Sequence, residues 1–212
     1  MEDLETWLDR VYESKGDRKT LDDLYDEWAQ TYDQQIWASG NPYIAVSTGI
    51  VGRNVKDLDA SILDVGCGTG NMGQILHQMG YTNLEGLDPS KGMLKIAEQK
   101  GFYKKLHTLT LAEEIDLPKN HYDAVVGAGV LTHGHAPPES LDGMLDITKP
   151  SGSIIFSLSN IAFEEMGFKE KIDELDRAGK WQQLDQSRLF RTYPFSEKEA
   201  HLRHWVYAYK KS

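Results

Sequence analysis

The chain has 212 residues, of which 40% are hydrophobic and 10% aromatic, a composition typical of a folded globular protein. Its length suits one α/β domain with a substantial core and is too short for two full domains. The formal net charge of −10 weighs against a nucleic-acid substrate, because phosphate binding usually requires a basic patch. We therefore predict a single domain, residues 1–212, that has no nucleic-acid partner.

The sequence contains one cysteine, Cys67, which excludes an internal disulfide and fits a reducing compartment. Its first residues are acidic and lack the apolar core of a signal peptide, and no apolar run reaches the roughly 18 residues of a membrane span. The seven histidines show no spacing typical of a metal site. These features predict a cytoplasmic protein without membrane contact and without a metal.

Three amphipathic helices are predicted ahead of the first strand. Their spans are 4–16, 20–36 and 42–55. The second has Thr20 as its predicted N-cap, with Asp23 three residues on, and it carries an apolar and aromatic face. We expect the helices of residues 1–58 to form part of a cap over a pocket and residues 59–212 to form the core.

From residue 59 onward, predicted strands alternate with predicted helices. The strands are expected at 61–65, 84–88, within 103–111, at 122–131 and at 153–158, and the helices at 72–79, 89–101, 141–148 and 168–179. Two further segments, 181–191 and 204–210, read as antiparallel strands. Such alternation produces a parallel sheet with right-handed crossovers. The predicted fold is therefore α/β, a Rossmann-like doubly wound sheet that is mostly parallel with an antiparallel C-terminal strand and an N-terminal helical cap.

A glycine loop follows the first predicted strand. Gly66, Gly68 and Gly70 stand two residues apart after a short apolar run that contains Asp64. Glycine allows a tight turn and leaves room for a ligand against the backbone. The next segment has helical spacing, so the loop directs backbone N–H groups toward a helix N-terminus. This arrangement predicts a ligand site.

Two kinds of ligand compete for this loop. Residues 68–73 satisfy the Gly-x-Gly-x-x-Gly pattern of dinucleotide-binding folds, and Asp88 follows at about the distance of a ribose-binding acid. Asp64, however, would repel an anionic pyrophosphate. S-adenosylmethionine carries an ammonium and a sulfonium and no phosphate, so acids at two successive strand ends suit it better. We therefore favour this cofactor over a dinucleotide.

Three core motifs and one N-terminal motif resemble those of class I S-adenosylmethionine-dependent methyltransferases. They are Ile62–Gly70, Gly86–Ser90 with Met93-Leu94 after it, Thr148–Gly152, and Tyr25–Asp33 ahead of the first strand. The likeness runs from about residue 21 to residue 181. Within this family, Leu131–His135 and Lys149-Pro150 are similar to the methyltransferase-like proteins.

The resemblance implies a set of cofactor-binding residues. The set is Tyr32, Asp64, Gly66, Cys67, Gly68, Asp88, Pro89, Met93, Leu111, Ala112, Glu113 and Gly127. In this family, backbone at the first two glycines contacts the methionine part, Asp64 supports its ammonium and Asp88 takes the ribose hydroxyls. Met93 would pack on adenine, and Tyr32 would close over the methionine end.

One position departs from the family pattern. Many relatives have an aspartate after the third strand that accepts from the adenine amino group, whereas the matching place here holds Leu111. Backbone at Ala112 or the side chain of Glu113 would then hold the adenine, and the sequence leaves this choice open.

The expected reaction is an in-line displacement that moves the methyl group to a small, partly apolar acceptor. His133, or else His135, would act as general base if the acceptor must lose a proton, and otherwise both cap loop backbone. The acceptor is expected between the N-terminal helices and the segment after the fifth strand, with Phe163, Met166, Phe168 and Tyr193 as an apolar wall. The alternatives are a module that binds the cofactor or its demethylated product without catalysis, or a dinucleotide-dependent enzyme.

Overall fold

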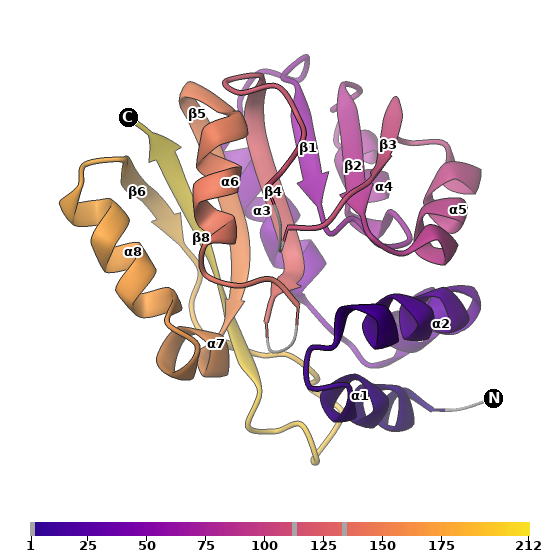
Figure 1. The fold of residues 1–212 in the computed structure, drawn as a ribbon. Coiled ribbons are helices and arrows are strands. Elements are labelled where there is room, and N and C mark those ends of the chain that lie inside the picture. Colours follow the sequence, from indigo (N-terminus) through magenta and orange to yellow (C-terminus); the bar gives the residue numbers. More distant parts are fainter. Residues whose placement is uncertain (1–2, 112–113, 133–134) are drawn as a thin grey trace.

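The computed structural model describes residues 3–111, 114–132 and 135–212. Its strands are β1 (Ile62–Val65), β2 (Leu84–Asp88), β3 (Lys105–Thr108), β4 (Tyr122–Leu131), β5 (Thr148–Ser159), β6 (Trp181–Gln186), β7 (Phe190–Arg191) and β8 (Arg203–Lys211). Its helices are α1 (Leu4–Glu13), α2 (Arg18–Ala38), α3 (Tyr43–Asn54), α4 (Asn71–Gln78), α5 (Lys91–Lys100), α6 (Ser140–Ile147), α7 (Asn160–Glu165) and α8 (Phe168–Arg177). Figure 1 shows one central sheet with helices on both faces, and α1 and α2 lie together at the lower right, beyond the lower ends of the strands.

The sheet is doubly wound. Its strand order is β3-β2-β1-β4-β5-β8-β6, and β7 also pairs with β8. The first five strands of this order are parallel, whereas β8 is antiparallel to both β5 and β6. The chain winds outward from β1 to β3 and then returns to place β4 on the other side of β1. This arrangement confirms the predicted fold class and puts the switch point, where such sheets bind ligands, between β1 and β4.

Two apolar clusters cover the two faces of the sheet. Because successive strand residues point to opposite faces, Leu63 and Val65 join the cluster under α6 and α8, while Ile62 joins the cluster under α3 and α4. All three side chains are fully buried. The short strand β1 is thus anchored from both sides, and the loop that follows it starts from a rigid position.

A third cluster lies outside the sheet, under the two N-terminal helices α1 and α2, which we call the cap. Trp7 of α1 stacks on Trp28 of α2 with ring centroids 5.3 Å apart, and Tyr193 and Leu202 from the C-terminal segment pack against them. Helix α3, the third helix of residues 1–58, does not join this cluster. The apolar face of α3 packs on the sheet instead, since amphipathic spacing shows that a face is buried but not what covers it.

Several boundaries differ from the expectation. Helix α2 begins at Arg18, because Asp17 and not Thr20 is the N-cap, and its Oδ1 accepts from the Thr20 amide at 2.9 Å. The short helix α7 was not predicted. The single strand expected at 181–191 is two strands, β6 and β7, separated where the Ser187 amide bonds to the Val206 carbonyl oxygen.

Candidate functional site

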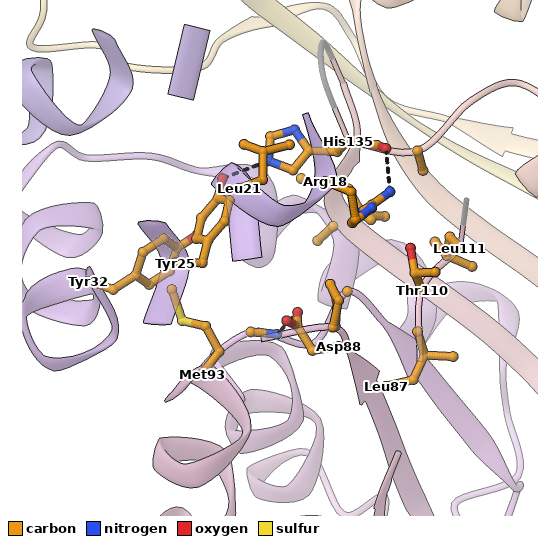
Figure 2. Close-up of a pocket in the computed structure, with 17 residues that line it drawn as sticks. Arg18, Leu21, Tyr25, Tyr32, Leu87, Asp88, Met93, Thr110, Leu111 and His135 are labelled. Carbon is orange, nitrogen blue, oxygen red and sulfur yellow. Dashed lines mark hydrogen bonds between the residues drawn. The ribbon is translucent and has the colours of Figure 1, made fainter. Parts of the chain in front are cut away.

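Three cavities meet beneath the cap, and Tyr32 of α2 lines all of them. The first cavity extends from the glycine loop past Asp88 to the end of the segment that follows β3. Its empty volume is about 700 Å³ with the open space at its mouth included. In Figure 2, Tyr25, Tyr32 and Met93 stand on one side of this cavity and Thr110 and Leu111 on the other.

The glycine loop forms a wall shared by the first and third cavities. Gly66 and Gly68 have φ angles of +68° and +53°, in the left-handed region that favours glycine. A Cβ atom at Gly66 would meet Val130 at 2.7 Å, whereas one at Gly68 would meet no heavy atom within 4 Å. Gly66 is therefore needed for packing, and the missing side chain of Gly68 leaves open space for a ligand.

Asp88, at the end of β2, connects the glycine loop to the next loop. Its Oδ2 accepts from the Gly68 amide and its Oδ1 from the Ser90 amide, both at 2.9 Å. The side chain is 9% exposed and lines the first cavity. Burial raises the pKa of Asp88 to about 6, against the two amide hydrogen bonds that lower it. Each oxygen keeps a lone pair that is free to accept from a ligand in the cavity.

Asp64, near the end of β1, lines the third cavity and is 2% exposed. Its Oδ2 accepts from the Tyr103 hydroxyl at 2.5 Å, and that hydroxyl in turn accepts from the Gly73 amide at 3.1 Å. Burial raises the pKa of Asp64 to about 7, partly offset by the Tyr103 hydrogen bond. A positively charged group in the third cavity would favour the ionised form of this carboxyl group.

The cap is hydrogen-bonded to the loops that line the site. Asp26 of α2 accepts from the Ser90 hydroxyl at 2.6 Å and from the Gly92 amide at 2.7 Å. About two turns later on the same helix, Asp33 accepts from the Thr69 hydroxyl and pairs with Lys100 at 2.6 Å. These contacts fix α2 over the carboxyl ends of β1 and β2.

The structure brings most of the predicted cofactor residues together. Those that line the first or third cavity are Tyr32, Asp64, Gly66, Cys67, Gly68, Asp88, Pro89, Met93 and Leu111. Ala112, Glu113 and the predicted base His133 lie outside the described residues. Burial raises the pKa of the Cys67 thiol well above its usual value, which fits a packed, unreactive side chain.

Gly127 requires a correction. It lines none of the three cavities, because its Cα lies against β1, where a Cβ would meet Val65 at 2.9 Å. The residues of β4 that do line the first cavity are Ala128, Gly129 and Val130. Sequence alone could not separate these adjacent small residues, because the register of β4 shifts between Gly127 and Leu131.

The second cavity lies between the cap, the end of β4 and the segment that leads into β8, with an empty volume of about 520 Å³ including its open part. Tyr193 lines it as expected, but Phe163, Met166 and Phe168 do not, because they pack on the sheet with α6 and α8. The aromatic lining comes mostly from the cap and from the first residue of α3. It comprises Tyr12, Tyr25, Trp28, Tyr32 and Tyr43.

His135 lies at the boundary of the first and second cavities. Its Nε2 shares a hydrogen bond of 2.7 Å with the Tyr25 hydroxyl, and its carbonyl oxygen accepts from Arg18 at 3.2 Å (Figure 2). Both partners come from α2. The ring of His135 thus holds the loop after β4 against the cap.

Several lining residues escaped the sequence analysis. Arg18, Thr110 and His204 are examples. Tyr103, which lines none of the three cavities but donates to Asp64, was also missed. The Tyr25–Asp33 motif did indicate α2, but no local signal connects Tyr103 or His204 to a site. Their positions depend on contacts between distant parts of the chain.

Among the described residues, no group of three His, Cys, Asp or Glu side chains is arranged to hold a metal ion. Within the same residues, no helix is both long and apolar enough to cross a membrane.

An open α/β sheet of this kind binds its ligands at the switch point, where the glycine loop and Asp88 line the first cavity. The chain belongs to the methyltransferase domain family, whose model matches residues 27–207. It is 34% identical over 168 residues to human methyltransferase-like protein 27, covering 76% of this chain and 68% of that protein. It is therefore a class I methyltransferase, and S-adenosylmethionine is its cofactor.

Solved structures support the fold. Magnesium protoporphyrin IX methyltransferase from Synechocystis PCC 6803 with bound SAH matches with a TM-score of 0.61 at 18% identity, over 84% of this chain and 86% of that chain. A putative S-adenosylmethionine-dependent methyltransferase from Listeria monocytogenes also matches with a TM-score of 0.61 at 15% identity, over 79% of this chain and 99% of that chain.

Replacing Gly68 by alanine should weaken cofactor binding by at least about tenfold, because the new methyl group would occupy open space in the cavity. The positive φ should lower stability by about 1–2 kcal/mol. Gly101→Ala is a matched control, since Gly101 has φ +71° and open space around its Cβ position but ends α5 away from the cavities. Calorimetric titration with S-adenosylhomocysteine would compare the two variants. Equal affinities for them would contradict the expected role of Gly68.

Proposed function

We propose that this methyltransferase moves the methyl group of S-adenosylmethionine to a small, partly apolar acceptor by in-line displacement. The observation that carries this proposal is the meeting of three cavities at Tyr32. Two of them are lined by the glycine loop and its acids. The other is lined mainly by aromatic and aliphatic side chains. Such a junction suits a transfer between a polar cofactor and an apolar acceptor.

The residues present fit the cofactor. The open space at Gly68 can accommodate it, and the free lone pairs of Asp88 match two ribose hydroxyls. Asp64 offers a carboxylate to the ammonium of the methionine part. In this proposal the adenine contacts Met93 and Leu111, which line the same cavity as Asp88 and Pro89.

When bound, S-adenosylmethionine supplies a methyl group that is already activated by its sulfonium. The protein therefore mainly has to orient the two reactants and keep water out, which can supply roughly 7–11 kcal/mol in favourable cases. Helix α2 performs both tasks in this proposal. Its Asp26 and Asp33 tie the cap to the loops, and its Tyr32 stands where the cavities join.

No general base is needed for an acceptor that is already a nucleophile. For an acceptor that must lose a proton, His133 stays our sequence-based candidate. His135 is engaged with the Tyr25 hydroxyl, so its place supports a structural role in holding the loop to the cap.

We further propose that residues 1–212 work as one domain, because the cap and the core share the hydrogen bonds of Asp26 and Asp33. The cytoplasmic location stays a prediction from composition. The narrower likeness to the methyltransferase-like protein of the Williams-Beuren syndrome critical region rests on Leu131–His135 and Lys149-Pro150, and it also stays a proposal.

Calorimetry and a methyl-transfer assay would test this function together. We expect S-adenosylmethionine and S-adenosylhomocysteine to bind and NAD not to bind. We also expect radiolabelled methyl to appear in at least one member of a panel of uncharged aromatic phenols, thiols and amines. Binding without transfer to any member would favour the silent cofactor-binding module, and NAD binding without S-adenosylmethionine binding would overturn the proposal.

A further inference from the structure

A buried histidine ring with an unpaired nitrogen lines one side of the second cavity. His204, at the start of β8, lines this cavity and is 2% exposed. Its Nδ1 is 2.7 Å from the Thr192 hydroxyl oxygen, whereas its Nε2 has no hydrogen-bond partner among the described residues. Buried ring nitrogens are nearly always paired, so an unpaired one on a side chain that lines a cavity points to a ligand.

The Thr192 hydroxyl determines which ring nitrogen carries the proton. Thr192 is 1% exposed, and among the described residues its hydroxyl has a hydrogen-bond partner only in Nδ1 of His204. The hydroxyl proton would be unsatisfied if Nδ1 also carried a proton, so the hydroxyl donates and Nδ1 accepts. Nε2 of the neutral ring then bears the hydrogen and is a donor.

The remaining walls indicate the shape and charge of the partner. Trp28, Tyr43 and Tyr193 contribute aromatic rings, and the described lining residues include no Asp, Glu, Lys or Arg. Burial lowers the pKa of His204 to about 4, so its ring is also uncharged near pH 7, like the other lining side chains named above. An ionised ligand would be buried in this cavity without a counter-ion, which is unfavourable.

We propose that the second cavity is the acceptor subsite and that Nε2 of His204 orients an uncharged, flat, aromatic acceptor by donating to an oxygen or ring nitrogen of that molecule. This inference rests on the proposed methyltransferase function and adds the class of acceptor and a positioning residue. The aromatic walls hold the ring system of the acceptor. The single directional contact selects one orientation, with another part of the acceptor toward the junction at Tyr32.

Two isosteric probes test the hydrogen bond. Isoquinoline offers a ring nitrogen as acceptor and is neutral at pH 8, whereas naphthalene has the same shape and no acceptor. Their Kd values would be measured by NMR titration with S-adenosylhomocysteine present. The ratio of the naphthalene Kd to the isoquinoline Kd should fall about five- to tenfold from the wild type to His204→Phe, on the order of one neutral hydrogen bond.

If His204 had only a structural role, its replacement would weaken the binding of both probes together. For the proposed hydrogen bond, the affinity for naphthalene should instead stay within about twofold in His204→Phe. His201→Phe is the matched control, because His201 is exposed in the same segment and lines none of the cavities. Thr192→Val keeps the His204 ring but removes the hydroxyl that fixes its proton on Nε2. This variant should lower the ratio of the naphthalene Kd to the isoquinoline Kd about two- to threefold.

The outcomes separate the two proposals. An unchanged ratio in His204→Phe and Thr192→Val, with normal S-adenosylhomocysteine binding, would overturn the role of His204 and leave the methyltransferase function intact. Absence of S-adenosylhomocysteine binding to the wild type would instead contradict the proposed function. If His204→Phe fails to fold, the Thr192→Val ratio decides.

Discussion

Asp64→Asn should stabilise the ligand-free protein at pH 8 and weaken its binding of S-adenosylmethionine. Burial raises the pKa of Asp64 to about 7. Between its ordinary value of about 3.9 and that pH, the folded protein holds a proton that the unfolded chain does not, so stability falls as pH rises through this window. Asparagine carries no such proton. We expect the variant to gain about 1–4 kcal/mol at pH 8 and little near pH 4.

The same change should lower the affinity for S-adenosylmethionine roughly 10- to 100-fold, since two opposite charges about 4 Å apart gain on the order of 1–4 kcal/mol. Urea unfolding at pH 4 and pH 8 gives the change in stability, and calorimetry gives the change in affinity. Glu85→Gln is a suitable control, because Glu85 on β2 also accepts from a tyrosine hydroxyl, that of Tyr122, and lines none of the cavities. Loss of both stability and affinity in Asp64→Asn would indicate a structural role only.

Asp88→Ala should reduce cofactor affinity by about 100-fold or more, because two hydrogen bonds from ribose hydroxyls to a carboxylate are each worth about 1.5–3 kcal/mol. It should also lower the free energy of unfolding by about 1–3 kcal/mol, since the Gly68 and Ser90 amides lose their acceptor. Calorimetry and urea unfolding measure the two effects.

Adenosine separates the roles of the two acids, because it has the ribose hydroxyls and lacks the ammonium. Asp88→Ala should weaken adenosine binding, and Asp64→Asn should leave it unchanged. Asp123→Ala serves as the control, since Asp123 accepts from the Ser61 amide at the amino ends of β1 and β4, away from the cavities. Its stability should fall while its affinity for adenosine stays the same. Equal adenosine affinity in Asp88→Ala and the wild type would remove Asp88 from the site.

The fold was predictable because local patterns agreed with the tertiary arrangement. Strands alternated with helices, and the short apolar run of Ile62, Leu63 and Val65 forms a strand that is packed on both faces of the sheet. The boundaries were less predictable. Both Asp17 and Thr20 are good N-cap residues, and only the hydrogen bond from the Thr20 amide shows that Asp17 takes this place.

The cofactor side of the site was also predictable in large part, because its residues follow strand ends directly. In a parallel sheet those ends share one edge, so Asp64, Gly68 and Asp88 had to lie close together. Gly127 was misplaced by a shift in the register of β4, which no local pattern encodes. The expected wall of Phe163, Met166 and Phe168 failed for a similar reason, since an apolar residue can pack on either the core or a cavity.

The sequence by itself determined the fold class, the position of the glycine loop and the two acids, because spacing along the chain and the rules of parallel sheets suffice for these. Only the tertiary structure decided how the site is completed. Tyr103 meets Asp64 from 39 residues away, and Thr192 meets His204 from the far end of a long loop. Such contacts depend on the packing of the whole chain, which brings the Tyr103 hydroxyl to Asp64 and the Thr192 hydroxyl to the ring of His204.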